Sequence, residues 1–163
     1  MLEFVYKQND NETYTVMAYH GDEEIVIIEA IHADKPVTIL YDSLFKNHPE
    51  IKEVVIPDTV EDIGGFMFDG CENLVSIKLP SSLKNLWQYA FVRSNIEEIE
   101  IPAGVMTIPP FAFKDCKKLK KVICHSGLKK IHDYAFEGCN SLVEILCDPS
   151  TEIGENAFGI ARR

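Results

Sequence analysis

The side chains best suited to chemistry lie around one loop in the second half of the sequence. Cys124 and His125 precede this loop, and His132 and Asp133 follow it. A set of thiol, imidazole and carboxylate groups could hold a metal ion or supply a general base. However, Cys124 occupies a position that is expected to point into the core, and the two histidines fall at variable turn positions. We therefore expect hydrogen-bonded or solvated histidines here and no metal site.

The sequence motifs of common catalytic sites are absent. The chain contains no GxxxxGK[ST] or GxGxxG phosphate-binding loop, no HExxH zinc motif, no GxSxG nucleophile motif and no EF-hand loop. Carboxylates are abundant, but no two have a spacing that indicates paired acid–base work. The sequence thus predicts that the protein is not an enzyme and needs no cofactor.

The cysteines are odd in number and show no CxxC spacing, which argues against a disulfide framework or a zinc ribbon. We expect them to be free thiols that pack as small apolar residues. The five are Cys71, Cys116, Cys124, Cys139 and Cys147.

The composition is that of a folded protein, with 163 residues, 46% of them apolar and 26% charged. A net charge of -10 disfavours binding to nucleic acid or to an anionic membrane. No apolar run approaches the about 20 residues that span a bilayer, so we expect no membrane insertion. No signal peptide is visible, which predicts a cytoplasmic protein, or a secreted or cell-surface one if a leader was removed.

Charge is unevenly distributed along the chain. Residues 1–66 hold 14 acidic and 4 basic residues, whereas residues 67–163 hold 12 of each. Seven lysines gather within one stretch of the second part. They indicate either a solvated face or a basic patch for an acidic partner, including the acidic end of another copy. These lysines are Lys114, Lys117, Lys118, Lys120, Lys121, Lys129 and Lys130.

An internal repeat organises the sequence after residue 36. Phenylalanines recur at intervals of 23, 23, 22, 23 and 22 residues, each preceded by a small or apolar residue. Such a period is typical of a solenoid, in which each unit buries its apolar face only against its neighbours. We expect the phenylalanines to stack as one buried ladder. They are Phe45, Phe68, Phe91, Phe113, Phe136 and Phe158.

Each unit contains one short segment with a period of two, such as Ile99-Glu100-Ile101, followed in three units by proline. Alternation of this kind predicts a short strand with its apolar side chains directed inward. The segment around each phenylalanine resembles a short helical turn, and Gly70 and Gly138 stand where a left-handed cap would end it.

The residues that recur at the same positions of each unit resemble the BspA-like leucine-rich repeat, as in units 63–86 and 131–145. The resemblance implies an α/β solenoid, a right-handed superhelix with one parallel β-sheet face and short helices or turns opposite. It covers residues 37–159, and we assign 37–163 to one domain of about five units plus a partial sixth. Because such proteins are often adhesins or host-interaction modules, the resemblance also implies a binding role.

Residues 1–36 lack the repeat and are rich in strand-forming residues. Segments 14–19 and 24–28 flank His20-Gly-Asp-Glu, so we expect a β-hairpin between them. This hairpin would act as the N-terminal cap that a repeat array requires.

The outward positions of the predicted sheet are the candidate site, because repeat proteins commonly bind partners across such a face. We expect a non-catalytic interaction module with a protein or peptide partner. The alternative is a structural unit that self-associates end to end as a homo-oligomer. Trp87, at the closing turn, is expected to pack partly against the neighbouring turn. The candidate binding face comprises Glu53, Val55, Ser76, Lys78, Glu98, Glu100, Lys121, Ile123, Glu144 and Leu146.

Overall fold

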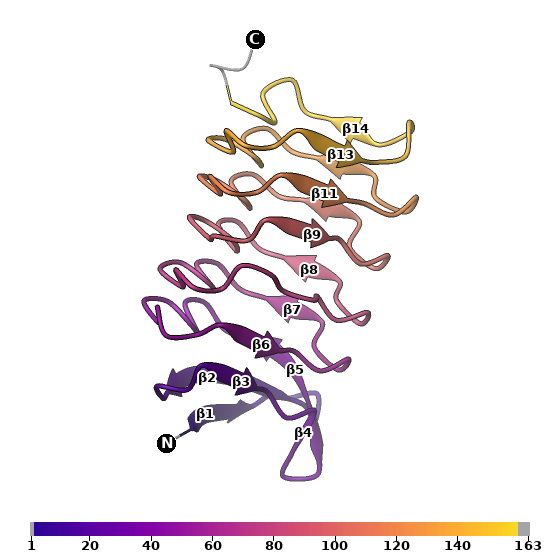
Figure 1. The fold of residues 1–163 in the computed structure, drawn as a ribbon. Coiled ribbons are helices and arrows are strands. Elements are labelled where there is room, and N and C mark those ends of the chain that lie inside the picture. Colours follow the sequence, from indigo (N-terminus) through magenta and orange to yellow (C-terminus); the bar gives the residue numbers. More distant parts are fainter. Residues whose placement is uncertain (1, 160–163) are drawn as a thin grey trace.

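The chain folds as a β-solenoid whose turns stack along one axis, with β1 at one end and β14 at the other (Figure 1). The computed structural model describes residues 2–159. Most turns carry strands on two sides, which form a front and a rear row and enclose the core. Within residues 2–159 no helix is long and apolar enough to cross a membrane.

The front sheet is a parallel stack with one interruption. β3 pairs with β6, and β9, β11 and β13 form a second group. The strand predicted between these groups is absent, because residues 71–80 take no strand conformation. The front strands are β3 (Ile25–Ile27), β6 (Glu53–Val55), β9 (Glu98–Glu100), β11 (Lys121–Ile123) and β13 (Glu144–Leu146).

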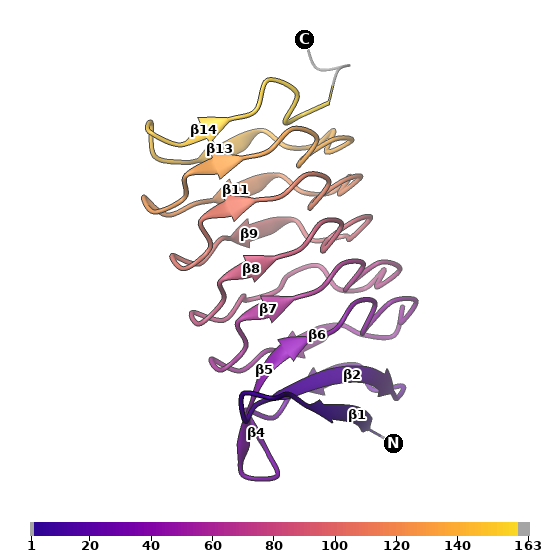
Figure 2. The ribbon, with the colours of Figure 1, turned by 180° about the vertical axis from the view of Figure 1, so that it is seen from behind.

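A rear row of parallel strands was not expected from the sequence (Figure 2). Most of these strands have only two residues, which is too short for alternation to be visible. Their bounds are β2 (Tyr14–His20), β5 (Lys35–Leu40), β7 (Asp62–Ile63), β8 (Asn85–Leu86), β10 (Thr107–Ile108), β12 (Lys130–Ile131) and β14 (Glu152–Ile153). The first four pair in that order, and the last three form a separate group.

The strands predicted at 14–19 and 24–28 form as β2 and β3, but their predicted pairing as a hairpin was wrong. β1 (Glu3–Gln8) pairs antiparallel with β2, through the turn at residues 9–13. β2 and β3 do not pair with each other, because the chain between them crosses from the rear sheet to the front one. β2 pairs in parallel with β5, and β3 with β6, so both belong to the first turn of the solenoid. A short β4 (Ile31–His32) pairs with β5.

The phenylalanine ladder is confirmed as the centre of the core. Five of its six rings are at most 1% exposed, and the last, Phe158, is partly buried. Neighbouring rings stack with centroid separations from 5.0 to 6.0 Å. The ladder runs through every turn after residue 43, so truncation of an interior ring removes contacts from two neighbouring turns.

The short helices predicted around the phenylalanines are not found in the described chain, where these segments are turns. The reason is backbone conformation. Residues two before and two after the phenylalanine have positive φ, as in Tyr89 (62°) and Arg93 (54°) around Phe91. A right-handed helix cannot continue through left-handed residues. Gly70 and Gly138, with φ of 83° and 78°, have the expected left-handed conformation, but they end turns rather than helices.

A second aromatic ladder lies beside the first. Phe66, Tyr89, Phe111 and Tyr134 stack with centroid separations from 5.1 to 5.4 Å and nearly parallel planes. All four have positive φ, which is uncommon for bulky residues. The stacked rings stabilise this backbone conformation in each turn.

Candidate interaction surface

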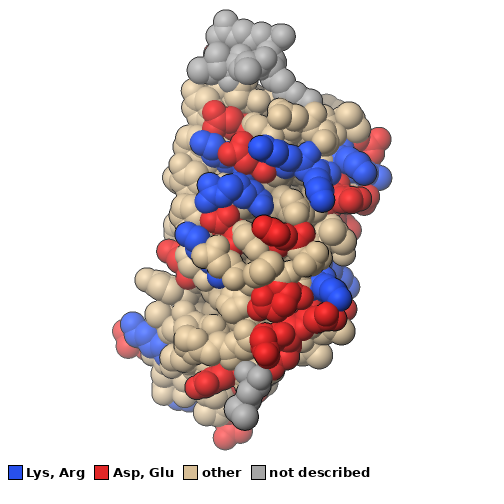
Figure 3. Space-filling model, turned by 60° about the vertical axis from the view of Figure 1, so that its left-hand side comes forward, with Lys and Arg blue, Asp and Glu red and all other residues tan. Residues whose placement is uncertain are grey.

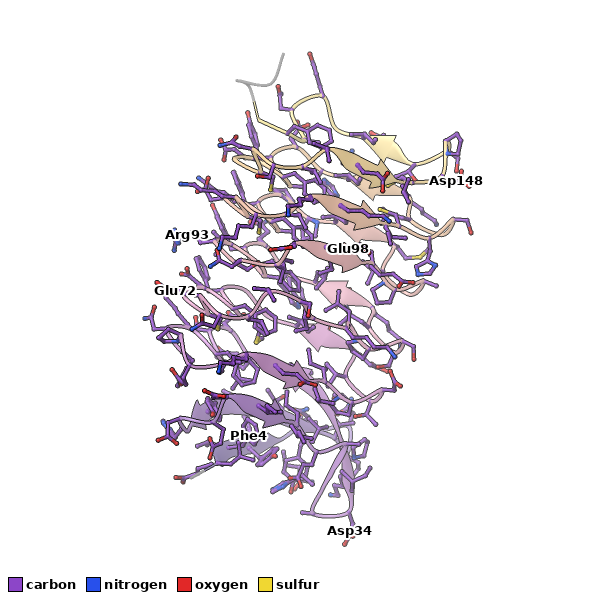
Figure 4. All side chains as sticks on the ribbon, in the orientation of Figure 1. Phe4, Asp34, Glu72, Arg93, Glu98 and Asp148 are labelled. Atoms are coloured by element: carbon purple, nitrogen blue, oxygen red, sulfur yellow. The ribbon has the colours of Figure 1, made fainter. Side chains whose placement is uncertain are left out.

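The ten predicted face residues lie on the front side in two columns that run along the solenoid axis. Strand pairing aligns Glu98, Lys121 and Glu144 in one column, and Glu100, Ile123 and Leu146 in the other. Glu53 and Val55 lie on β6 and extend the same columns. Ser76 and Lys78 fall in the interruption between β6 and β9. Figure 4 labels Glu98 on β9, near the middle of this side.

The apolar members of the face form two separate patches rather than one. Val55 is 41% exposed and lies beside Ile27, which is 59% exposed. Ile123 lies beside Leu146, which is 47% exposed. Between the two patches, the second column carries Lys78 and Glu100.

β3 was missed as part of this face because its residues precede the recognised repeat. Ile25 and Ile27 are 55% and 59% exposed, while Val26 between them is buried. The alternation Ile-Val-Ile gives no polar residue to mark the outward side. Its signal in the sequence is a strand-forming run that lies 28 residues before the equivalent run at Glu53–Val55, rather than 22 or 23.

Several charges on the front side are paired across neighbouring turns. Lys121 Nζ lies 3.4 Å from Glu144 Oε1, and His125 Nε2 lies 3.5 Å from Glu100 Oε1. In the described part of the chain, Glu53 and Glu98 have no cationic partner. These two carboxylates are therefore the negative groups of the face that no neighbouring cation compensates.

The interruption of the sheet produces two hollows on the front side. One, of 570 Å³, lies between β6 and residues 76–80, and the other, of 710 Å³, lies between residues 76–79 and β9. Among the described residues, Ser76–Leu79 form no backbone hydrogen bonds to either neighbouring turn. The edges of β6 and β9 that face this segment consequently keep unpaired backbone groups, which are natural points of recognition for an extended chain.

The Cys/His/Asp set does not converge on a common point. Residues 2–159 contain no cluster of three or more potential metal-ligating His, Cys, Asp or Glu side chains. His125 contacts Glu100, and Cys124 Sγ lies 2.7 Å from Cys147 Sγ in the next turn. Burial raises the pKa of both thiols. This arrangement places two protonated thiols side by side.

All five cysteines are free, and three of them are fully buried. The thiols of Cys71, Cys116 and Cys139 donate hydrogen bonds to the carbonyl of the phenylalanine one turn earlier, at 2.9 to 3.0 Å. Burial raises the pKa of Cys71 to about 12. The cysteine column of the repeat thus satisfies a core carbonyl, and Cys124 and Cys147 are only partly buried.

The lysine-rich stretch is largely neutralised by acidic residues of neighbouring turns. Lys114, Lys120 and Lys130 contact Glu137, Glu97 and Glu152 at 3.1 to 3.6 Å. Figure 3 shows Lys and Arg toward the C-terminal end, interleaved with acidic side chains, and mostly acidic residues toward the N-terminal end. This distribution favours a solvated face over a basic docking patch.

The expected packing of Trp87 was wrong, since its side chain is 57% exposed. It follows β8 on the rear sheet. Tyr41, which follows β5 on the same sheet, is 49% exposed. Sequence reasoning missed Tyr41, because it lies before the first complete unit of the repeat.

Fold and surface together define a non-globular repeat protein of the β-solenoid class. A family model for the BspA type leucine rich repeat region matches residues 38–161 in six copies. The chain belongs to the BspA-type leucine-rich repeat proteins.

Solved structures of bacterial leucine-rich repeat proteins share this fold. The leucine-rich repeat protein TpLRR of T. pallidum is 26% identical with a TM-score of 0.74, over 93% of this chain and 83% of that one. A Bacteroides ovatus leucine-rich repeat protein is 24% identical with a TM-score of 0.58, over 93% and 54%. One from Bacteroides capillosus is 21% identical with a TM-score of 0.53, over 89% and 94%. A search of curated protein sequences finds no match.

Proposed function

We propose that the protein is a non-catalytic interaction module that binds a protein or peptide partner across the front sheet. The observation that carries the proposal is the pairing of outward apolar side chains in neighbouring turns, exposed Ile27 with exposed Val55 and half-buried Ile123 with exposed Leu146. An apolar side chain that stands alone on a surface is ordinary, whereas adjacent ones mark a contact surface.

The interruption between the patches supports the same proposal. A partner that lies along the axis contacts one apolar patch at each end and the unpaired backbone of residues 76–79 between them. Glu53 and Glu98 would orient this partner by attracting its basic residues. The surface suits an extended segment, because the hollows run between turns rather than into the core.

Affinity capture with matched charge variants tests the front sheet. Glu53→Lys with Glu98→Lys reverses two unpaired carboxylates of the face. Glu72→Lys with Glu155→Lys makes the same change in net charge on turns away from it, and Figure 4 labels Glu72 at the edge that carries the phenylalanine turns. Proteins that the parent and the turn variant retain, but the face variant loses, support the proposal. Loss of the same proteins with both variants, or with neither, contradicts it.

Photo-crosslinking locates the contact. A photoreactive residue at Val55 or Ile123 should capture the partners that the charge variants identify. The same residue at Met106, which is 42% exposed and directly precedes β10 of the rear sheet, should not.

End-to-end self-association is the second candidate, and one observation favours it. Ile108 and Ile131 are fully buried in the rear column, but Ile153 of the last described strand is 46% exposed. A second copy stacked on this turn would bury it. Sedimentation over a range of protein concentrations should then show a dimer that Ile153→Arg abolishes. A monomer at every concentration would exclude this assembly.

A further inference from the structure

The rear sheet contains a hollow that the front-face proposal does not involve. It has a volume of 520 Å³ and lies over β5, β7 and β8, which are neighbours in Figure 2. Tyr41 and Trp87 both line it, together with Gly64, Gly65 and the carboxylate of Asp62. The hollow thus combines exposed aromatic rings with acidic groups.

The solenoid places these residues in successive turns. Gly64 N donates to Leu40 O at 3.0 Å, and Trp87 N donates to Ile63 O at 3.1 Å, so Tyr41, Gly64 and Trp87 occupy equivalent positions. Stacked strands are about 4.8 Å apart, which separates the backbones that carry the two rings by about 10 Å. A flat group between two rings needs about 7–8 Å, twice a van der Waals contact. One planar group therefore fits between the two rings.

Gly64, which occupies the turn between the two aromatic residues, is fixed by close packing. A Cβ atom on Gly64 would lie 2.7 Å from the backbone N and 2.9 Å from the Cα of Asp42. No larger residue fits without displacing this backbone. The turn between the two aromatic residues accordingly carries no side chain at this position.

The two carboxylates of the hollow, Asp42 and Asp62, can accept further hydrogen bonds and pair with a cation. Asp42 Oδ1 accepts a hydrogen bond from Gly65 N at 2.8 Å, and Asp62 Oδ1 accepts one from Asn85 Nδ2 at 2.6 Å. In residues 2–159 neither carboxylate has a cationic partner, and neither Tyr41 nor Trp87 stacks on another ring. Two free aromatic faces beside two uncompensated carboxylates attract a cation more strongly than a neutral ligand.

We propose that this hollow binds a cationic side chain of a peptide or protein partner, an arginine, between Tyr41 and Trp87. A guanidinium is planar, stacks on aromatic faces and donates paired hydrogen bonds to carboxylates, whereas a lysine ammonium acts as a point charge. The balance of 4 basic to 14 acidic residues in residues 1–66 adds a field of the required sign.

Tryptophan fluorescence tests the site directly, because Trp87 is the single tryptophan of the chain. The probe is a short neutral peptide with one central arginine, and the matched peptide carries citrulline, its uncharged isostere, in the same place. The arginine peptide should change the emission of Trp87 with a saturable dependence, and added salt should weaken it. The proposal would be overturned by equal responses to both peptides or by no response at millimolar peptide. It would also be overturned if a neutral oligosaccharide, tested as a third probe, were the one ligand that changed the emission.

Matched variants assign the response to the hollow. Tyr41→Ala and Asp42→Asn should each weaken the arginine peptide roughly three- to tenfold, the range expected for one cation–π or charged contact. Asp133→Asn is the control, since Asp133 Oδ1 accepts from Asn156 N at 3.0 Å as Asp42 Oδ1 does from Gly65 N, but lies outside the hollow. Circular dichroism confirms that each variant is folded. An affinity unchanged in Asp42→Asn, or equally reduced in Asp133→Asn, would contradict the assignment. Because the front-face variants leave this hollow intact, failure here leaves the function proposed above untouched.

Discussion

The guanidinium of Arg93 forms two hydrogen bonds with the carboxylate of Asp69 in the preceding turn, Nε to Oδ1 at 2.9 Å and Nη2 to Oδ2 at 2.7 Å. The Asp69 side chain is 8% exposed, whereas that of Arg93 is 57% exposed. The contact with Asp69 raises the pKa of Arg93. A buried carboxylate is thus neutralised from the surface by a neighbouring repeat unit, as in a solenoid whose stability depends on nearest-neighbour contacts.

Removal of Arg93 should destabilise the protein. Arg93→Ala leaves the Asp69 carboxylate buried with only Lys46 Nζ at 3.9 Å, so we expect a loss of about 1–3 kcal/mol. Arg93→Lys should recover only part of this, because an ammonium cannot form the paired contact. Denaturant unfolding of these variants and of the double variant with Asp69→Asn gives the coupling between the two residues. Additive single effects would show that the pair is energetically unimportant.

Truncation of the ladder should have a larger effect. Phe113 is fully buried and stacks on Phe91 at 5.0 Å and on Phe136 at 5.1 Å. Phe113→Ala should cost about 3–5 kcal/mol, which thermal and denaturant unfolding would show as a markedly lower midpoint. Phe158→Ala is the comparison, since this ring is only partly buried and stacks on Phe136 at 6.0 Å. Equal losses for the two variants would contradict the importance of the buried interior.

The fold was predictable from the sequence because a solenoid repeats one local solution. The period of the phenylalanines alone places Phe68 on Phe91, and the alternation of Ile99-Glu100-Ile101 gives the inward side of β9. The spacing of the repeat carries this information even where a single unit is ambiguous.

The remaining features depend on backbone conformation that side-chain patterns do not encode. Tyr89 and Arg93 adopt positive φ although neither residue favours it, so the predicted helix becomes a turn. Ser76–Lys78 has the alternation of its neighbours but forms no ladder, and nothing in its residues distinguishes it from Glu98–Glu100 except charge. The hollow near Gly64 is lined by Tyr41 and Trp87, which lie two turns apart. These aromatic residues do not recur in the other units, so a search for repeated residues passes over them.

Gly70 should resist replacement by alanine, because its backbone is left-handed and closely packed. Gly70 has φ of 83°, and a Cβ atom there would lie 3.2 Å from the backbone N and Cα of Asn47. Gly70→Ala should therefore cost about 1–2 kcal/mol or more. Gly127→Ala is a matched control, because its Cβ would meet only the Ala103 carbonyl at 3.4 Å, an ordinary contact. Unfolding midpoints should fall for the first variant and stay level or rise slightly for the second. The reverse order would be inconsistent with the turn conformation described here.

Cys124 and Cys147 should form a disulfide on oxidation of the folded protein. Their Sγ atoms are 2.7 Å apart, and stacked parallel strands place the Cα atoms about 4.8 Å apart, within the range that a disulfide spans. Diamide takes up the two hydrogen atoms as the two thiols lose two electrons and two protons. Because burial raises the pKa of both thiols, little thiolate exists at neutral pH, and the reaction should accelerate as pH rises.

Peptide mapping after blocking of free thiols should show the link between residues 124 and 147, and the oxidised protein should melt at a higher temperature because the link closes a loop of the unfolded chain. Cys124→Ser removes the product and serves as the control. A mixture of pairings that includes Cys71 would indicate oxidation of unfolded molecules, since that thiol is 1% exposed in the core. Two free thiols after prolonged treatment at alkaline pH would show that the contact does not permit the bond.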